Sequence, residues 1–418
     1  MHKTPRIQLI LVILISLLVG YYFGVNKINF DWKGFKPQIT VASKEPPPQV
    51  TNVDFEQFWT VWQKLEKDYY DKTKLDPQKM LNGAISGMVQ SLDDPFTVYL
   101  PPVQNDNFKQ GMAGQFQGIG AELGMKDQKI IVISPLNGSP AQKAGVRAGD
   151  FIVAVNKQST AAMTLSQAVE KIRGEKGTTV ELTLLHKDEE KTRDIKIIRD
   201  VITVKSVQTW IKKGKEIDAI ELDKKYAEAN IAYVSLSQFG DNTNSEWLAA
   251  INEMNLKLSK TPVEGIILDL RNNPGGYLTD AVFISSEFVE EGSDVVSEED
   301  ATGKNVLKAN RRGFLTDVPV VVLINKGSAS ASEIVAGALR DNQRATLVGE
   351  TSFGKGTIQQ AEDLGGGAGI HVTIAKWLTP NGTWVNGEGL KPDIEVKLDP
   401  KSPERDTQLE KAVLELLK

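Results

Sequence analysis

The chain has 418 residues and a formal net charge of −5, so it is longer than one ordinary domain and lacks the positive charge typical of nucleic-acid-binding proteins. Hydrophobic residues make up 40% and charged residues 25%, which excludes wholesale disorder, a collagen-like chain and a polytopic membrane protein. Cysteine is absent, and the three histidines are too far apart in sequence for a zinc motif, so we expect no thiol chemistry, metal or other cofactor.

An apolar run at residues 7–25 is nearly long enough to cross a ~30 Å hydrocarbon layer. Lys3 and Arg6 precede it, so the positive-inside rule places the N-terminus in the cytoplasm and the bulk of the protein outside it. A cleaved signal peptide is the alternative, but aromatic residues 21–23 stand where a small-x-small cleavage site would lie. We favour an uncleaved single-pass anchor in residues 1–25, followed by a proline-rich linker over residues 26–50.

Residues 51–110 are predicted to be helical. Apolar side chains from Phe55 to Tyr69 recur at the spacing of one helix face, and a second apolar stripe follows Asp76 and Pro77, which are typical of a helix start. Nothing polar interrupts these stripes, so they indicate packing in a core or a dimer rather than a cofactor site.

Residues 111–198 have the composition of a small β domain, with short β-rich runs separated by glycine and Asn/Asp turns. Within it, Ser139-Pro140, AQKAG and then GVRAGDFIVAVN resemble a PDZ domain along its whole length. A PDZ domain binds a peptide C-terminus as an added strand and catches the carboxylate on backbone N–H groups. The resemblance places peptide binding at Gly118, Ile119, Gly120 and Ala121, whereas the alternative is a hairpin with two glycines. Lys157 departs from the family pattern at a turn.

Residues 199–398 alternate between strands and helices, and apolar strands such as EGIILDL and VPVVVLIN predict a buried α/β core. Three glycine-containing loops end such strands. The loop at 269–276 carries two glycines whose N–H groups can form an oxyanion hole, although a plain strand-to-helix turn explains it too. The loop at 327–333 places Ser330 at a helix start, where the helix dipole favours negative charge. Ser330 and Glu333 also match a capping box, which needs no catalysis.

The third loop, at 349–357, contains G-x-x-x-x-G-K, but Gly356 stands where a nucleotide-binding loop needs Ser or Thr. A lysine can instead serve a serine as general base when desolvation lowers the pKa of its amine. Ser330 and Lys355 therefore suit acyl transfer, with Gln359 able to orient the amine without adding charge. His371 as the base of a Ser-His-Asp triad is the rival mechanism, which we disfavour because no Gly-x-Ser-x-Gly elbow is present.

In this order, LDDPFTVY, the PDZ run, YVSLSQF, GIILDLRNNPGG, SASASE, ETSFGKGTIQQ and TPNGTWVNGEGLKPD resemble the carboxyl-terminal processing (tail-specific) protease family of Ser-Lys peptidases. The resemblance spans roughly residues 54–393. It implies a multidomain α/β fold: a crotonase-like protease core with an inserted PDZ domain and N-terminal helices. It also implies Ser330 as nucleophile, Lys355 as general base and Gln359 as the partner of the lysine.

The same resemblance implies that Gly276 and the Ala331 N–H are the oxyanion donors, and that Ser328 and Ser332 are bystanders. It places an arginine that senses the bound peptide at Arg173, and it makes a homodimer plausible through the N-terminal helices and an amphipathic helix in residues 399–418.

The resulting hypothesis is a membrane-anchored serine endopeptidase outside the cytoplasm that captures proteins by apolar C-terminal tails and cleaves them. It predicts protein or peptide partners with free C-termini, and no nucleic acid. A membrane PDZ scaffold without activity is the alternative from another class. A trypsin-like PDZ protease is disfavoured because no GDSGG motif appears.

Overall fold

The fold was analysed in a computed structural model, in which the described residues are 15–17, 28–33, 36–41, 54–126, 128–136, 138–186, 189–399, 402 and 404–418. Two units can be distinguished: Met1–Pro101 with Asp363–Ile370, and Pro102–Glu362 with His371–Lys418. Apart from residues 15–17, the predicted membrane anchor lies outside the described residues. Within the described ranges, no helix has the length and apolar character needed to span a bilayer.

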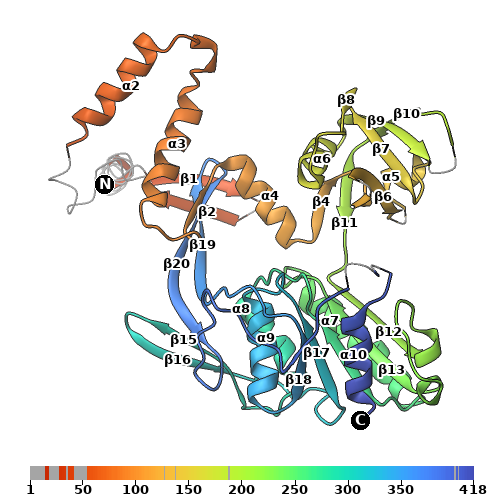
Figure 1. The fold of residues 1–418 in the computed structure, drawn as a ribbon. Helices are drawn as coiled ribbons and strands as arrows, with labels where there is room; N and C mark the ends of the chain where they lie inside the picture. Colours follow the sequence, from red (N-terminus) through yellow and green to blue (C-terminus); the bar gives the residue numbers. More distant parts are fainter. Residues whose placement is uncertain are drawn as a thin grey trace, which may run out of the picture. The chain divides into compact units, whose positions relative to one another are not determined.

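The first unit contains the hairpin β1 (Ile28–Lys33) and β2 (Lys36–Val41), the helices α2 (Glu56–Asp68), η2 (Lys72–Lys74) and α3 (Pro77–Gln90), and β3 (Val98–Leu100) (Figure 1). As predicted, Asp76 caps α3 through the N–H groups of Gln78 and Lys79, and Pro77 is its first residue. Helix α2 has no buried residue. Its apolar stripe is therefore not part of a core among the described residues, and its role in a dimer stays a prediction.

The second unit begins with α4 (Pro102–Met112) and a β domain. One sheet has the order β10-β9-β7-β6-β5, with β8 paired to β7. Its strands are β5 (Ala121–Lys126), β6 (Lys129–Pro135), β7 (Asp150–Val155), β8 (Gln158–Ser159), β9 (Thr179–His186) and β10 (Arg193–Ile198). The domain also contains α5 (Pro140–Lys143) and α6 (Leu165–Ile172). Strand β4 (Gln115–Gly118) pairs instead with β11 (Asp200–Thr203), so a strand beyond the predicted boundary at residue 198 returns to the start of the domain.

The larger α/β core is built on a sheet of order β12-β13-β14-β17-β18-β21, parallel except for β12. Its strands are β12 (Val207–Lys213), β13 (Asn230–Leu236), β14 (Gly265–Asp269), β17 (Val320–Ile324), β18 (Ala345–Gly349) and β21 (Ile394–Glu395); the short helices η3 (Gly214–Glu216) and η4 (Lys224–Tyr226) join β12 to β13. Every residue of β14 and β17 is buried, as expected for parallel strands covered on both faces.

Helices cover both faces of this sheet (Figure 1). On one face Ile266 and Leu268 share a core with α7 (Thr243–Leu258), α8 (Leu278–Ser285) and α9 (Ala331–Asp341). On the other face Ile267 and Val321 pack with α10 (Thr407–Leu416). The alternation of side chains along each strand therefore divides one apolar run between two cores.

A second sheet of order β16-β15-β20-β19 comprises β15 (Asp294–Asp300), β16 (Gly303–Lys308), β19 (Thr357–Gly365) and β20 (Ala368–Leu378). The tip of the β19–β20 hairpin belongs to the first unit, and β3 pairs with β20. Strands β14, β17 and β18 are neighbours and parallel, so the three loops singled out in the sequence leave the same edge of the large sheet.

Candidate active site

Ser330 is the N-cap residue of α9 and has a strained backbone, with φ 55° and ψ −116°. The neighbouring serines are committed to other bonds. Ser328 and Ser332 are fully buried, and their hydroxyls donate to the carbonyls of Leu270 (2.8 Å) and Asn273 (2.8 Å). Ser330 is only half-buried. Of the three serines in this loop, Ser330 is therefore the one whose side chain solvent or a substrate can reach.

The glycine loop at 269–276 is bonded directly to the serine loop. The Asn273 carbonyl accepts the Ala329 N–H (3.0 Å), and the Asn273 side chain accepts the Gly275 N–H (2.9 Å). Gly275 has φ +94°, and a Cβ there would lie 2.8 Å from the Ser330 Cβ and 2.9 Å from the Ala331 nitrogen. Only glycine allows this approach, because a larger residue would collide with Ser330 and its neighbour.

The predicted oxyanion donors are Gly276, at the end of the glycine loop, and Ala331, at the start of α9. Gly276 is held against Phe239, whose N–H donates to the Gly275 carbonyl (2.9 Å) and whose carbonyl accepts the Tyr277 N–H (3.0 Å). Ala331 is the first residue of α9, where backbone N–H groups have no partner within the helix. Within the described part of the chain, neither the Gly276 nor the Ala331 N–H has an acceptor. Such free donors beside a serine are what a developing oxyanion requires.

The loop that carries Lys355 is fixed by its main chain. The Phe353 N–H donates to the Ser328 carbonyl (2.9 Å), which joins this loop to the serine loop. The Lys355 carbonyl accepts the indole N–H of Trp377 (2.9 Å), and the Gly356 carbonyl accepts that of Trp384 (2.9 Å). Two tryptophans thus anchor the backbone around Lys355, whose side chain is half-buried.

Gln359 lies on β19, two residues into the strand. Its amide nitrogen donates to the hydroxyls of Thr357 (2.9 Å) and Thr373 (3.0 Å). Since both amide hydrogens are used in these bonds, the carbonyl oxygen is the group left to accept a hydrogen bond from an amine.

His371 lies near enough to Lys355 for the charge of the lysine to affect it. It is half-buried on β20, with its ring against that of Phe108 at a centroid distance of 4.4 Å. Burial, and secondarily the positive charge of Lys355, lower the pKa of His371. No carboxylate is hydrogen-bonded to His371 within the described residues, so the arrangement of a Ser-His-Asp triad is not found there.

Glu333 is the residue that sequence reasoning undervalued. Its carboxylate accepts the Ser330 N–H (2.7 Å), as the capping-box interpretation predicts. It also accepts three donors from the lysine loop, which the interpretation did not predict. A glutamate at the third position of a helix is usual in a capping box, so the sequence held no further signal, and the full burial of this side chain is seen only in the structure.

The predicted peptide-binding residues lie at the start of the β domain. Ile119 is buried in the core of that domain, and Gly120 has φ +72°, where a Cβ would lie 2.5 Å from the Ser139 Cβ. Gly118 ends β4, and Ala121 begins β5. The guanidinium of Arg173 stacks over the Phe116 ring at 4.9 Å. A pocket of about 880 Å³ is lined by α4, β4 and α6, including Leu165, Val169 and Arg173.

Comparison with known proteins decides the family. The model of peptidase family S41 matches residues 230–396, a PDZ domain model matches residues 131–185, and the activating protease CtpB N-terminal domain matches residues 15–102. The carboxy-terminal processing protease CtpA of Bacillus subtilis (strain 168) is 38% identical over 345 residues, which cover 82% of this chain and 69% of CtpA. The chain belongs to peptidase family S41.

Two further similarities support this S41 peptidase as a serine-type enzyme. Carboxy-terminal processing protease CtpB of the same organism is 35% identical, over 90% of this chain and 74% of CtpB. A solved photosystem II D1 C-terminal processing protease is 33% identical with a TM-score of 0.51, covering 86% of this chain and 96% of its own. The predictions of a C-terminal processing protease with a PDZ domain, a mixed α/β core and serine peptidase activity are confirmed.

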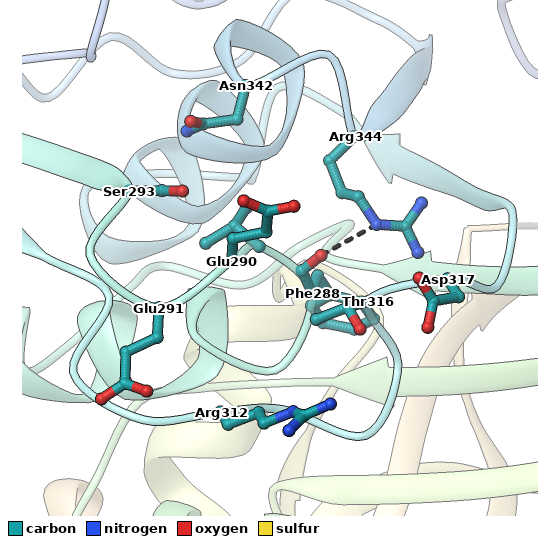
Figure 2. Close-up of a pocket in the computed structure, with 10 residues that line it drawn as sticks. Phe288, Glu290, Glu291, Ser293, Arg312, Thr316, Asp317, Asn342 and Arg344 are labelled. Atoms are coloured by element: carbon teal, nitrogen blue, oxygen red, sulfur yellow. Dashed lines mark hydrogen bonds between the residues drawn. The ribbon is translucent and has the colours of Figure 1, made fainter.

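A second pocket of this S41 peptidase lies away from Ser330. It has a volume of about 560 Å³ and lies around Asn342, the C-cap residue of α9, whereas Ser330 is the N-cap residue (Figure 2). Arg344 in its wall donates to the carbonyls of Phe288 (2.8 Å) and Leu315 (2.7 Å). This arginine therefore satisfies main-chain acceptors, and the pocket has no arrangement suited to acyl transfer.

Asp280 is a buried carboxyl whose charge is expected to affect the stability of the peptidase. It lies in the first turn of α8, is 5% exposed, and accepts a hydrogen bond from the Asn244 amide (2.8 Å). Burial raises the pKa of Asp280 to about 6, and the negative charge of Asp241 adds to this increase. The hydrogen bond from Asn244 acts in the opposite direction and lowers the pKa. The second carboxylate oxygen of Asp280 and the Asn244 carbonyl oxygen have no partner among the described residues.

We expect Asp280→Asn to raise the free energy of unfolding at pH 7 by about 1–3 kcal/mol, because the new amide removes a buried charge and can donate to Asn244. The pKa of an aspartate in the unfolded state is about 3.9. A carboxyl whose pKa is higher than this in the folded state destabilises the folded protein at pH values above about 3.9. The gain should therefore shrink as pH falls from 7 to 4. Urea unfolding at pH 7, 5 and 4 measures it, and a gain that is independent of pH would contradict the explanation.

Proposed function

We propose that this S41 peptidase hydrolyses peptide bonds with Ser330 as nucleophile and Lys355 as general base. The observation that carries the proposal is the strained, accessible Ser330 beside two free backbone N–H groups, on a loop bonded to the one that bears Lys355. A neutral lysine amine accepts the hydroxyl proton as the Ser330 oxygen attacks the scissile carbonyl. The Gly276 and Ala331 N–H groups then stabilise the oxyanion.

Collapse of the tetrahedral intermediate breaks the C–N bond, and the lysine ammonium returns its proton to the leaving amine. Water then attacks the acyl-enzyme, again with the lysine as base, and Ser330 is regenerated. The Gln359 carbonyl oxygen accepts a hydrogen bond from the amine and keeps it directed at Ser330, because its amide hydrogens are already bonded to Thr357 and Thr373. A neutral amide partner stabilises the lysine cation less than a carboxylate would.

The proposed substrates are proteins with apolar C-terminal tails, which the PDZ domain holds by adding them as a strand. Residues 118–121 receive the terminal carboxylate in this proposal, and Leu165 and Val169 of α6 receive the apolar side chains. Arg173 lies beside this site, stacked on Phe116, and is proposed to respond to the bound tail.

The proposal places the catalytic part outside the cytoplasm, on a crotonase-like core attached to the membrane by the apolar run at residues 7–25. The exposed aromatic side chains of Trp59 in α2 and of its N-cap residue Phe55, at 55% and 52% exposure, support a homodimer contact through the N-terminal helices.

The proposal is tested by incubating the full chain in detergent with one unfolded protein that ends either in an apolar or in a charged tail. We expect faster cleavage of the apolar-tailed protein and no cleavage by Ser330→Ala. Equal cleavage of both tails would refute the PDZ-tether proposal, whereas cleavage by Ser330→Ala would refute the assignment of the nucleophile. Peptide binding by Ser330→Ala serves as the folding control.

A further inference from the structure

The carboxylate of Glu333 joins the main chains of the two proposed catalytic residues through one oxygen atom. Oε2 accepts the N–H of Ser330 at 2.7 Å and the N–H of Lys355 at 2.9 Å. The side chain is fully buried. Since both bonds end on the same atom, the separation of the two backbones is fixed by hydrogen-bond geometry rather than by general packing.

The second oxygen of Glu333 binds the same lysine loop. Oε1 accepts the hydroxyl of Ser352 (2.5 Å) and the N–H of Gly354 (2.7 Å). The Ser352 hydroxyl in turn accepts the N–H of Leu390 (2.6 Å), which secures that side chain from behind. Three of the four donors to the carboxylate therefore come from residues 352–355.

This arrangement exceeds what a helix cap requires. In a capping box the glutamate side chain makes one bond, to the N–H of the N-cap residue, and this is one of the four bonds that the Glu333 carboxylate accepts. An ionised carboxylate has only acceptor sites, so it can receive all four donors, and hydrogen bonds to an ionised group are stronger than neutral ones. The charge is satisfied by main-chain N–H groups and one hydroxyl, so it does not require the Lys355 amine as a counter-ion.

We propose that Glu333 is a positioning residue that sets the distance between the Ser330 hydroxyl and the Lys355 amine, which rests on the proposed Ser-Lys mechanism. It acts through the backbones and does not touch substrate. Displacement of a catalytic group by about 1 Å can reduce a rate about 10²-fold, so a loosened lysine loop should impair the chemical step more than substrate binding.

The principal variant is Glu333→Gln in the full chain. In the glutamine variant an NH2 group replaces one carboxylate oxygen. This group is a donor and cannot accept the two hydrogen bonds that the oxygen accepted, while the size and shape of the side chain are kept. We expect kcat to fall about 10²-fold with KM changed less than about threefold. The matched control is Glu287→Gln, which alters a fully buried carboxylate bonded to Arg311 and the Phe314 N–H (both 2.6 Å), away from both loops. We expect the control variant to lose as much thermal stability as Glu333→Gln but to keep kcat within about threefold of the native value.

A double variant separates positioning from general damage. If Glu333 acts through Lys355, then Glu333→Gln combined with Lys355→Ala should lose no more activity than Lys355→Ala alone. If the activity loss of the double variant equals the product of the losses of the two single variants, the proposal is overturned. An unchanged kcat in Glu333→Gln would overturn it as well. Should Lys355→Ala itself retain activity, the Ser-Lys mechanism fails instead, so the two failures are distinguishable.

A weaker variant covers the case in which Glu333→Gln does not fold. Ser352→Ala removes one of the four donors and leaves the carboxylate in place. We expect kcat to fall about tenfold, with KM and binding of an apolar-tailed peptide to the PDZ domain unchanged. A Ser352→Ala variant with native kcat, or with an altered KM alone, would overturn the proposal.

Discussion

Replacement of Lys355 by methionine is expected to lower kcat about 10²- to 10⁴-fold, which is the usual contribution of a general base. Methionine keeps an unbranched apolar side chain of similar length and removes the amine. A 10³-fold loss corresponds to about 4 kcal/mol of transition-state stabilisation. The main chain of this residue still donates to Glu333 and accepts from Trp377, so the loop should keep its conformation.

The pH dependence of the rate should also change when the Lys355 amine is removed. In the proposed mechanism the neutral amine is the reactive form, so kcat/KM of the native enzyme should rise with pH through the pKa of the lysine. The methionine variant should lose this rise together with most of its rate. Lys326→Met is the control, since Lys326 is an exposed lysine at the start of the serine loop. A variant at Lys355 that keeps the native pH profile would show that another group is the base, and His371 would be the first residue to examine.

Much of the site was predictable because its residues follow buried strands. The run EGIILDL indicated a central strand, and loops at the carboxyl ends of neighbouring parallel strands must share one edge of the sheet. Ser330, Gly276 and Lys355 could be grouped by their residue types at the ends of predicted strands and by the family resemblance, whereas the adjacency of the three strands is seen only in the structure. The helix start at Asp76 and Pro77 was also readable, because capping depends only on local residues.

What the sequence could not predict depends on contacts between distant segments. Glu333 matches a local capping motif, so its bonds to the lysine loop about twenty residues later were hidden behind a sufficient local explanation. A Cβ on Gly275 would lie 2.8 Å from the Cβ of Ser330, and sequence spacing did not show that this close approach falls on Gly275 rather than on Gly276. The position of His371 near Lys355 was not predicted, because no periodic pattern records which loop a strand faces.

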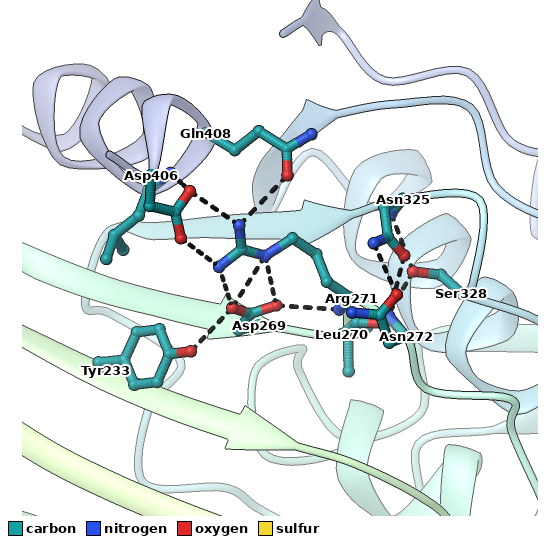
Figure 3. A network of polar contacts seen from close by, with 10 residues as sticks. Tyr233, Asp269, Leu270, Arg271, Asn272, Asn325, Ser328, Asp406 and Gln408 are labelled. Atoms are coloured by element: carbon teal, nitrogen blue, oxygen red, sulfur yellow. Dashed lines mark hydrogen bonds and ion pairs between the residues drawn. The ribbon is translucent and has the colours of Figure 1, made fainter. Parts of the chain in front are cut away.

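Loss of Arg271 is expected to destabilise the large domain strongly. It follows strand β14 and lies between two carboxylates, Asp269 (2.6 Å) and Asp406 (2.9 Å) (Figure 3). Asp406 is the N-cap residue of α10, more than a hundred residues away in sequence. Tyr233 donates its hydroxyl to Asp269 (2.7 Å), and Arg271 also donates to the Gln408 carbonyl oxygen (3.2 Å). Burial disfavours the charge on Arg271, but the two carboxylates outweigh burial and raise its pKa.

We expect Arg271→Met to lower the free energy of unfolding by about 3–5 kcal/mol, because it leaves a buried carboxylate without its counter-ion. Asp269 is the residue affected, since its side chain is only 7% exposed. Arg271→Lys should have an intermediate effect, since an ammonium keeps the charge but cannot bond both carboxylates in the planar geometry of a guanidinium. Urea unfolding at pH 7 provides the measurement.

An exposed ion pair supplies the control for this loss. Lys257 and Glu253 on α7 lie 2.7 Å apart but are 58% and 67% exposed, so Lys257→Met should change stability by less than about 0.5 kcal/mol. Asp406→Asn should fall between the two, because it can keep the cap of α10 while losing one partner of Arg271. An Arg271→Met variant no less stable than Lys257→Met would show that hydrophobic packing alone holds α10 on the sheet. The opposite result would mean that the stability of the C-terminal helix depends on Arg271 in the glycine loop at 269–276.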